Sequence, residues 1–220
     1  MTERLPLFPL GTVLFPGLVL PLHLFEERYR LLVRDLLERP EPRLLGIVGI
    51  ELGHEVGDTA GMRLAEVGCA AEVRRVDPRP DGRYDIVTTG ATRFRIKELD
   101  RARPYLRGEV EFLPEEPGAD PRPYADRVRL LFRLYRHRLA AAGARVAEPA
   151  ALPDDPVRLS YLVAAAAVLD GHDKQRLLEA EDAAIRLRAL QDLLARETRL
   201  LGSLPTVPAG QFLDTSFHPN

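Results

Sequence analysis

The spacing of apolar residues changes several times along the chain. In residues 5–22, short apolar runs are interrupted by four prolines, Pro6, Pro9, Pro16 and Pro21. Proline lacks a backbone donor and clashes with the preceding turn, at a cost of about 3 kcal/mol inside a helix. The segment therefore predicts two extended pieces, 5–10 and 18–22, with a turn at Pro16-Gly17. The same prolines argue against a signal peptide and against a membrane-spanning helix.

A helical period follows, and strands return after it. Apolar residues spaced three and four apart predict one amphipathic helix that ends at Pro40: Leu24, Phe25, Tyr29, Leu32, Val33, Leu36 and Leu37. Strands are predicted at 43–50, 63–76, 84–99 and 105–113, where apolar runs, partial alternation and β-branched residues dominate. We expect Asp81-Gly82 to form a hairpin turn and Gly90 to mark a bulge or bend. These strands indicate a compact β-domain.

Residues 114–125 have the composition of a linker, and helices are predicted beyond them. The first is marked from Val128 to Leu139 by residues that include Leu131, Phe132, Leu134 and Tyr135, and it stops near Gly143. Asp155 then caps a buried, alanine-rich helix that runs to Gly171. Asp173 and Asp182 cap two more helices, and the last has a core stripe from Ile185 to Leu201.

The order of these elements predicts an α+β fold in two parts. We expect a β-rich domain at 1–116, a helical bundle at 117–204 and an irregular tail at 205–220. The chain has 220 residues, which suits one domain with an appendage or two small domains.

Charge and cysteine content narrow the functional classes. Residues 1–120 contain 17 basic and 21 acidic side chains, and the rest contain 14 and 12. Because a nucleic-acid binder should show a basic face, this balance argues against one. The single cysteine, Cys69, excludes an intrachain disulfide and fits a reducing, cytoplasmic setting. Its alternating apolar surroundings favour a buried role over a nucleophilic one.

The sequence contains no convincing catalytic or metal-binding pattern. His54 lies in a glycine-rich polar loop without a second histidine at helical spacing. His172 lies between Asp170 and Asp173, an arrangement that suits acid–base chemistry, but helix capping and turn formation already explain those acids. We therefore expect no metal, no cofactor and no catalytic residue.

A resemblance to a known family begins in the stretch LPLFPLGTVLFPGLVLPLHLFEERYRLLV, residues 5–33. It is similar to the start of the Lon-protease N-terminal domain, also called the Lon substrate-binding domain, in its stand-alone bacterial form. The likeness continues through LGIVGI, VGCAAEVRRVDPRPDGRYDIVTTGATRFRI, PYLRGEVEFL, KQRLLE and RLRALQDLL. The resemblance implies a PUA-like β pseudo-barrel followed by a helical bundle. It also implies that Glu26, Arg28 and Tyr29 tie the first helix to the barrel.

The resemblance implies a binding protein rather than an enzyme. A Lon protease also carries an ATPase module and a Ser–Lys peptidase module. These 220 residues contain no Gly-Lys dipeptide for a phosphate-binding loop. The lysines are Lys97 and Lys174, and neither lies in anything like a peptidase motif. The expected partners are apolar segments or peptides of unfolded or damaged proteins, and a separate protease that receives them.

Two surfaces suit such a partner: an apolar groove between barrel and helices, and an exposed strand edge. The candidate binding residues are Phe15, Pro16, Leu18, Leu20 and Arg93. Arg93 and Phe94 match family positions, and Arg93 either lines a groove or pairs with acids on neighbouring strands. The alternative that the apolar candidates are core and rim stays open. An RNA-binding PUA-like module is the second hypothesis, by analogy of fold alone, and a small hydrolase is the third.

Overall fold

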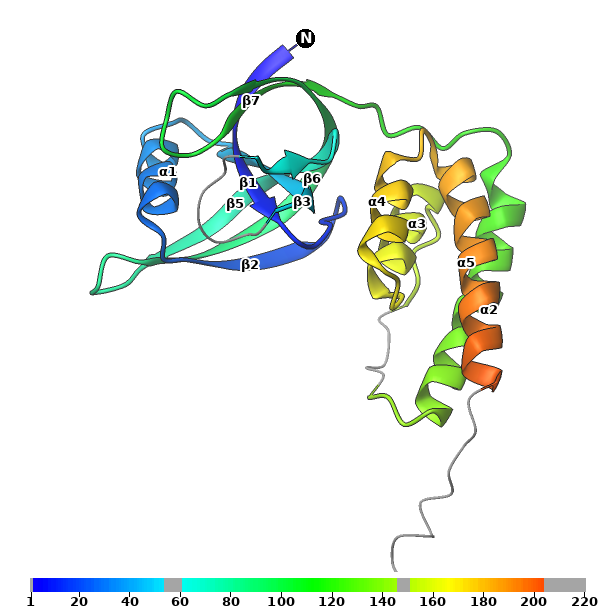
Figure 1. Cartoon of the computed structure of the whole chain (residues 1–220). Helices are drawn as coiled ribbons and strands as arrows, with labels where there is room; N and C mark the ends of the chain where they lie inside the picture. The colour runs from blue at the N-terminus through cyan, green and yellow to red at the C-terminus, as the bar shows by residue number, and fades with distance from the viewer. Residues whose placement is uncertain (1, 54–60, 146–150, 204–220) are drawn as a thin grey trace, which may run out of the picture.

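The structure, a computed structural model, describes residues 2–53, 61–145 and 151–203. The tail predicted at 205–220 and the loop that contains His54 lie outside these residues. The first part of the chain forms a β-barrel with one helix, and the second part forms a bundle of helices (Figure 1). The strands are β1 (Thr2–Leu10), β2 (Val19–Leu24), β3 (Leu44–Leu52), β4 (Arg63–Leu64), β5 (Val67–Pro78), β6 (Tyr84–Asp100) and β7 (Arg107–Phe112). The helices are α1 (Glu27–Leu37), α2 (Pro121–Ala141), α3 (Pro156–Ala166), α4 (Gly171–Glu179) and α5 (Ala183–Ser203).

The barrel closes because β1 pairs with strands on both of its sides. Its first half pairs antiparallel with β7, and its second half pairs parallel with β3. The strands β7, β6, β5 and β3 follow one another in the sheet, so pairing with β1 completes the ring. β2 lies outside this ring, antiparallel to the first half of β6. The predicted α+β class, with strands first and helices second, is confirmed.

Two glycines make the bends that the sequence predicts. Gly82 has φ +79°, and its N–H donates to the Arg79 carbonyl at 2.9 Å in the hairpin between β5 and β6. The β5–β6 register shifts between Ala70 and Ala71, which leaves Ala91 as an extra residue beside Gly90. A Cβ on Gly90 would lie 2.4 Å from the Phe15 carbonyl oxygen, so only glycine fits without movement of the backbone. The predicted hairpin and bulge are confirmed.

Helix α1 begins later than its apolar pattern predicts. Leu24 is the last residue of β2, and α1 begins at Glu27, so neither Leu24 nor Phe25 belongs to the helix. Leu24 is buried, whereas Phe25 is 47% exposed. The pattern misleads because a buried strand end runs directly into the helix. Tyr29 is buried and packs on Phe8 of β1, with ring centroids 4.3 Å apart. The Arg28 guanidinium lies 4.5 Å from the Tyr29 ring centroid.

The boundaries of three helices also differ from the prediction. α2 begins at Pro121, inside the predicted linker, after Asp120 with φ +47°. α3 ends at Ala166 rather than near Gly171, because Ala167 adopts an extended conformation. α4 begins at Gly171 and is capped by Asp170, whose carboxylate accepts from the Asp173 N–H at 2.7 Å. The prediction of Asp173 as the cap was therefore wrong.

The other two predicted caps are confirmed. The Asp155 carboxylate accepts from the Arg158 N–H, and the Asp182 carboxylate accepts from the Ile185 N–H, both at 2.8 Å. Such a cap contributes about 1 kcal/mol to a helix. Ile185 itself is 48% exposed and does not join the core stripe of α5, which starts at Leu187.

Substitution of Gly68 by alanine should destabilise the barrel. A Cβ there would lie 2.5 Å from the Ile47 carbonyl oxygen and 2.6 Å from Cζ of buried Phe94. We expect Gly68→Ala to lower the free energy of unfolding by about 1–3 kcal/mol, measured by urea denaturation. Gly171→Ala is the control, because no heavy atom lies within 4 Å of its Cβ position. Equal urea midpoints for the two variants would contradict the packing.

The Cys69 thiol should be unreactive in the folded protein. Cys69 is fully buried, and burial raises the pKa of its thiol above the ordinary value. The thiolate is the reactive form. At about pH 8, close to the reference pKa of a free cysteine, an accessible thiol reacts with a disulfide reagent such as dithionitrobenzoate. We expect this reagent to label the protein only after guanidinium chloride is added. Rapid labelling of the native protein, followed by absorbance, would show that Cys69 is accessible.

Candidate binding cleft between the barrel and the helices

A cleft of about 460 Å³ lies between the barrel and α4. Residues from four places in the chain line it. They are Gly11, Thr12 and Val13 after β1; Gly49, Ile50 and Glu51 of β3; Arg63 and Ala65 at β4; and Gly171, His172 and Gln175 of α4. Small side chains dominate this lining, so the cleft brings main chain as well as side chains to its surface.

One buried side-chain oxygen in the cleft has no hydrogen-bond partner among the described residues. The β1–β3 pairing ends at Leu10 and Gly49. Beyond it, Ile50 pairs with Leu64 of β4 and lines the cleft together with Glu51. Gln175 donates from Nε2 to the Val67 carbonyl at 2.9 Å. Its side-chain oxygen is buried and accepts no hydrogen bond from the described residues. Two charged side chains of the cleft lining neutralise each other, because the Arg63 guanidinium pairs with the Glu51 carboxylate at 2.9 Å.

Arg93 of β6 holds the far end of α4 against the barrel. The last carbonyls of a helix have no partner within the helix and carry its negative dipole end. The Arg93 guanidinium is 1% exposed and pairs with the Glu115 carboxylate at 3.1 Å. It also donates to four main-chain carbonyls: Leu178 at 3.0 Å, Ala180 at 2.5 Å, Glu181 at 3.3 Å and Pro114 at 2.9 Å. A barrel side chain therefore completes the C-terminus of α4.

A second buried arginine caps the same helix from α5. Arg186 donates to the Leu177 carbonyl at 2.8 Å and to the Ala180 carbonyl at 3.2 Å. It also lies 4.0 Å from the Tyr161 ring centroid, and burial lowers its pKa to about 10. At neutral pH it therefore stays charged. Two cations at one helix end complement the helix dipole, and both are buried.

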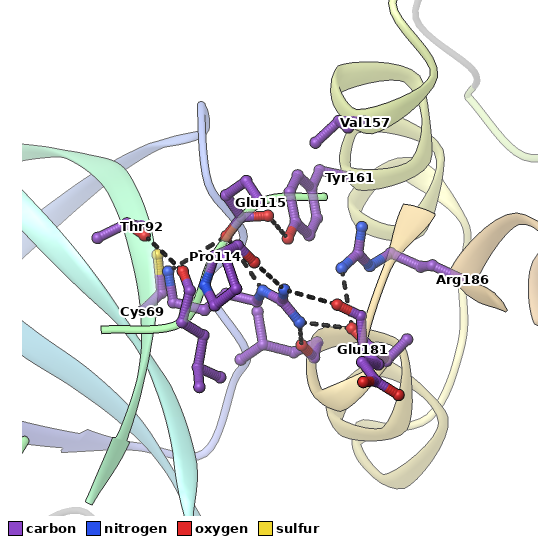
Figure 2. Close-up of polar contacts among 12 residues, drawn as sticks. Cys69, Thr92, Pro114, Glu115, Val157, Tyr161, Glu181 and Arg186 are labelled. Carbon is purple, nitrogen blue, oxygen red and sulfur yellow. Dashed lines mark hydrogen bonds and ion pairs between the residues drawn. The ribbon is translucent and has the colours of Figure 1, made fainter. Parts of the chain in front are cut away.

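Glu115 and Tyr161 join the two arginines into one network, which we call the α4 clamp: Arg93, Glu115, Tyr161 and Arg186. Figure 2 shows Glu115 and Tyr161 pointing toward each other across the interface. The Tyr161 hydroxyl donates to one Glu115 oxygen, and Arg93 pairs with the other. Burial raises the pKa of Tyr161 above its ordinary value, so its hydroxyl stays protonated and remains a donor.

The five residues predicted to bind a partner do not line the cleft. Phe15 and Arg93 are each 1% exposed, and Pro16 is also buried. Leu18 and Leu20 are half-buried and pack against the apolar cores. Phe15 joins the core of the bundle, with its ring centroid 6.0 Å from that of Tyr161. In this conformation the side chains of Phe15, Pro16 and Arg93 are not exposed to a peptide, and their role in binding stays a prediction.

The residues that do line the cleft carried little sequence signal. Gly11, Thr12 and Val13 lie just before the predicted candidates, but they are small and have no periodic pattern. Gln175 is an ordinary helix residue until its contact with Val67 is known. The sequence contains one partial indication of the cleft, because the candidate Phe15 lies only two positions after Val13.

A second hollow, of about 510 Å³, lies on α1 beside Pro104. Four of its six lining residues are charged: Glu26, Glu27, Arg28 and Arg34. It is more open than the cleft and does not suit an apolar segment. Within 2–53, 61–145 and 151–203, no group of three metal-ligating side chains gathers, and no helix has the length and hydropathy to cross a bilayer.

Loss of the Arg93 guanidinium should strongly destabilise the protein. Arg93→Met removes the cation that pairs with Glu115 and all the hydrogen bonds from Arg93 to the Leu178, Ala180, Glu181 and Pro114 carbonyls. Breaking a buried charge pair in this way costs about 3–5 kcal/mol. Arg95→Met is the matched control, because Arg95 lies on the same strand and is exposed. We expect it to change the free energy of unfolding by less than about 0.5 kcal/mol. Similar guanidinium unfolding curves for both variants would show that the α4 clamp contributes little.

Comparison with known proteins shows which family the chain resembles. Residues 4–196 match the family described as the ATP-dependent protease La (LON) substrate-binding domain. Lon protease 2 of Sorangium cellulosum is 31% identical over 209 residues, which cover 90% of this chain and 25% of that protein. Lon protease of Desulfovibrio desulfuricans is 30% identical over 206 residues, which cover 90% and 23%.

A solved structure agrees with these sequence matches. The crystal structure of a Lon N-terminal domain protein from Xanthomonas campestris superimposes with a TM-score of 0.63 at 26% identity, and covers 88% of this chain and 98% of that one. The chain spans about a quarter of the length of the curated relatives and matches their substrate-binding portion. On these grounds, the chain belongs to the Lon substrate-binding domain family.

Proposed function

We propose that the cleft between the barrel and α4 binds extended, apolar segments of unfolded or damaged proteins, and that the chain does not cut them. The observation that carries the proposal is the Gln175 side-chain oxygen, which has no partner among the described residues and lines the cleft together with β3 beyond its pairing with β1. An extended peptide can donate a backbone N–H to such an oxygen, whatever its sequence. The family's substrate-binding description supports the same class of partner.

The size and lining of the cleft favour weak, sequence-tolerant binding. Its volume of about 460 Å³ lies within the range of about 300–1,000 Å³ that is typical of ligand sites. Val13, Ile50 and Ala65 provide apolar surface, and Glu51, Arg63 and Gln175 provide polar groups beside it. Burial of apolar surface yields roughly 25 cal/mol per Å², part of which is lost to the ordering of the peptide.

The non-catalytic part of the proposal rests on where the perturbed groups lie. Active sites gather titratable groups with strongly shifted pKa values in a cleft. The described groups with the largest shifts, Cys69, Tyr161 and Arg186, are buried and do not line this cleft. Delivery of bound clients to a separate protease, and a cytoplasmic location consistent with a single buried cysteine, complete the proposal.

Ile50→Asp should weaken peptide binding in the cleft. A carboxylate there meets the apolar part of the client and adds charge beside Glu51. We expect the Kd for fluorescein-labelled, reduced and carboxymethylated lactalbumin to rise by about tenfold or more, equivalent to about 1.4 kcal/mol. Fluorescence anisotropy measures this, and gel analysis of the same sample tests that the lactalbumin stays intact.

Leu200→Asp is the control, because Leu200 is an exposed leucine at the end of α5 and does not line the cleft. It should leave the Kd unchanged. The proposal fails if the unaltered chain shows no binding at about 1 mM, the weak end of specific affinities, or if Ile50→Asp and Leu200→Asp bind equally. Cleavage of lactalbumin by the purified chain would contradict the absence of peptidase activity.

A further inference from the structure

The outward face of α2 has a composition unlike that of the other helices. Its inward face buries Ala125, Val128, Phe132 and Tyr135 in the bundle. The remaining positions of this 21-residue helix carry six arginines and His137, against one acidic residue, Asp126. α2 and α5 form the layer of the bundle farthest from the barrel (Figure 1).

Two exposed leucines form the centre of this face. Leu130 is 62% exposed and Leu134 is 44% exposed. They lie one turn apart, so their side chains adjoin on the helix surface. At 3.6 residues per turn, Arg127 and Arg138 flank them on one side, and Arg133 and His137 flank them on the other. We call these six exposed residues the α2 stripe: Arg127, Leu130, Arg133, Leu134, His137 and Arg138.

The cations of the α2 stripe are not used within the described fold. Asp126, the acidic residue of α2, pairs with Arg129 at 3.2 Å. Arg129 also donates to the Pro153 carbonyl at 2.6 Å, which ties it to the segment before α3. Arg127, Arg133 and Arg138 form no ion pair among the described residues. Like charges this close on a helix repel one another, which favours a partner that neutralises them.

We propose that the α2 stripe docks an acidic amphipathic helix of a partner protein. Two leucines between rows of arginine match a helix that has leucines on one face and glutamates on both flanks. A second copy of this face does not fit, because arginine would meet arginine. A nucleic-acid backbone pairs with the arginines but leaves the leucines without a partner. A membrane surface requires a broader apolar face than two leucines provide.

The test uses the full chain and labelled synthetic helices. One peptide has leucines at heptad a and d positions with glutamates on both flanks, and its pair has lysines in place of the glutamates. We expect the glutamate peptide to bind with a Kd about tenfold or more below that of the lysine peptide, by fluorescence anisotropy. Oligouridylate RNA and phosphatidylglycerol vesicles are measured in parallel and should bind more weakly.

Two variants locate the binding. Leu130→Lys keeps the positive charge and removes the apolar centre, so it should raise the Kd for the glutamate peptide by about tenfold. Arg133→Glu should raise the Kd for the glutamate peptide and lower the Kd for the lysine peptide. Leu200→Lys is the control on α5 and should change neither. Because these positions are exposed, we expect unchanged thermal midpoints.

Several outcomes would overturn the proposal. They are equal binding of the two peptides, no effect of Leu130→Lys or Arg133→Glu on the glutamate peptide, and RNA or vesicle binding that is tighter than peptide binding. The cleft variant Ile50→Asp should leave the glutamate peptide unaffected, and Leu130→Lys should leave lactalbumin binding unaffected. Loss of both activities in either variant would show that the α2 stripe is not a separate site.

Discussion

The Arg93 guanidinium at the C-terminus of α4 is the contact on which the arrangement of barrel and helices depends. It is buried, so its charge and the carbonyls it meets must satisfy one another. It does so with the end of α4 and with the segment that connects β7 to α2. Arg186 completes the same helix end from α5. The opposite end of α4, at Gly171 and His172, lines the cleft, so the α4 clamp positions one wall of the cleft.

In this arrangement, the residues of the α4 clamp are distinct from those of the cleft and the α2 stripe. The barrel contributes Phe15 and Val67 to the core of the bundle, and Gln175 returns a hydrogen bond from α4 to β5. Polar and apolar contacts therefore cross the same interface. The cleft keeps a length of β3 that β1 does not cover, and the α2 stripe lies in the outer layer of the bundle. The two proposed sites therefore lie on different parts of one frame.

Local rules predicted much of this fold. The prolines in residues 5–22, the Asp81-Gly82 hairpin and the Asp155 and Asp182 caps depend on neighbouring residues, so the sequence reveals them. The sequence could not show that the five candidate residues lie away from the cleft, because their positions depend on distant contacts: Arg93 and Leu178 are 85 positions apart. Periodicity also could not separate Leu134, which is exposed, from its buried neighbours Phe132 and Tyr135. Periodic spacing marks an apolar residue but does not show which apolar face is covered.

Native-state hydrogen exchange of α4 tests the central claim most directly. If the α4 clamp unites barrel and bundle, the amides near Leu177 and Leu178 should open only with the whole protein, with the same free energy as the core amides of β5 and β6. A uniform value across these three elements, measured by mass spectrometry at low denaturant, is the predicted result. Exchange of α4 through a separate local opening, while β5 and β6 stay protected, would contradict the account.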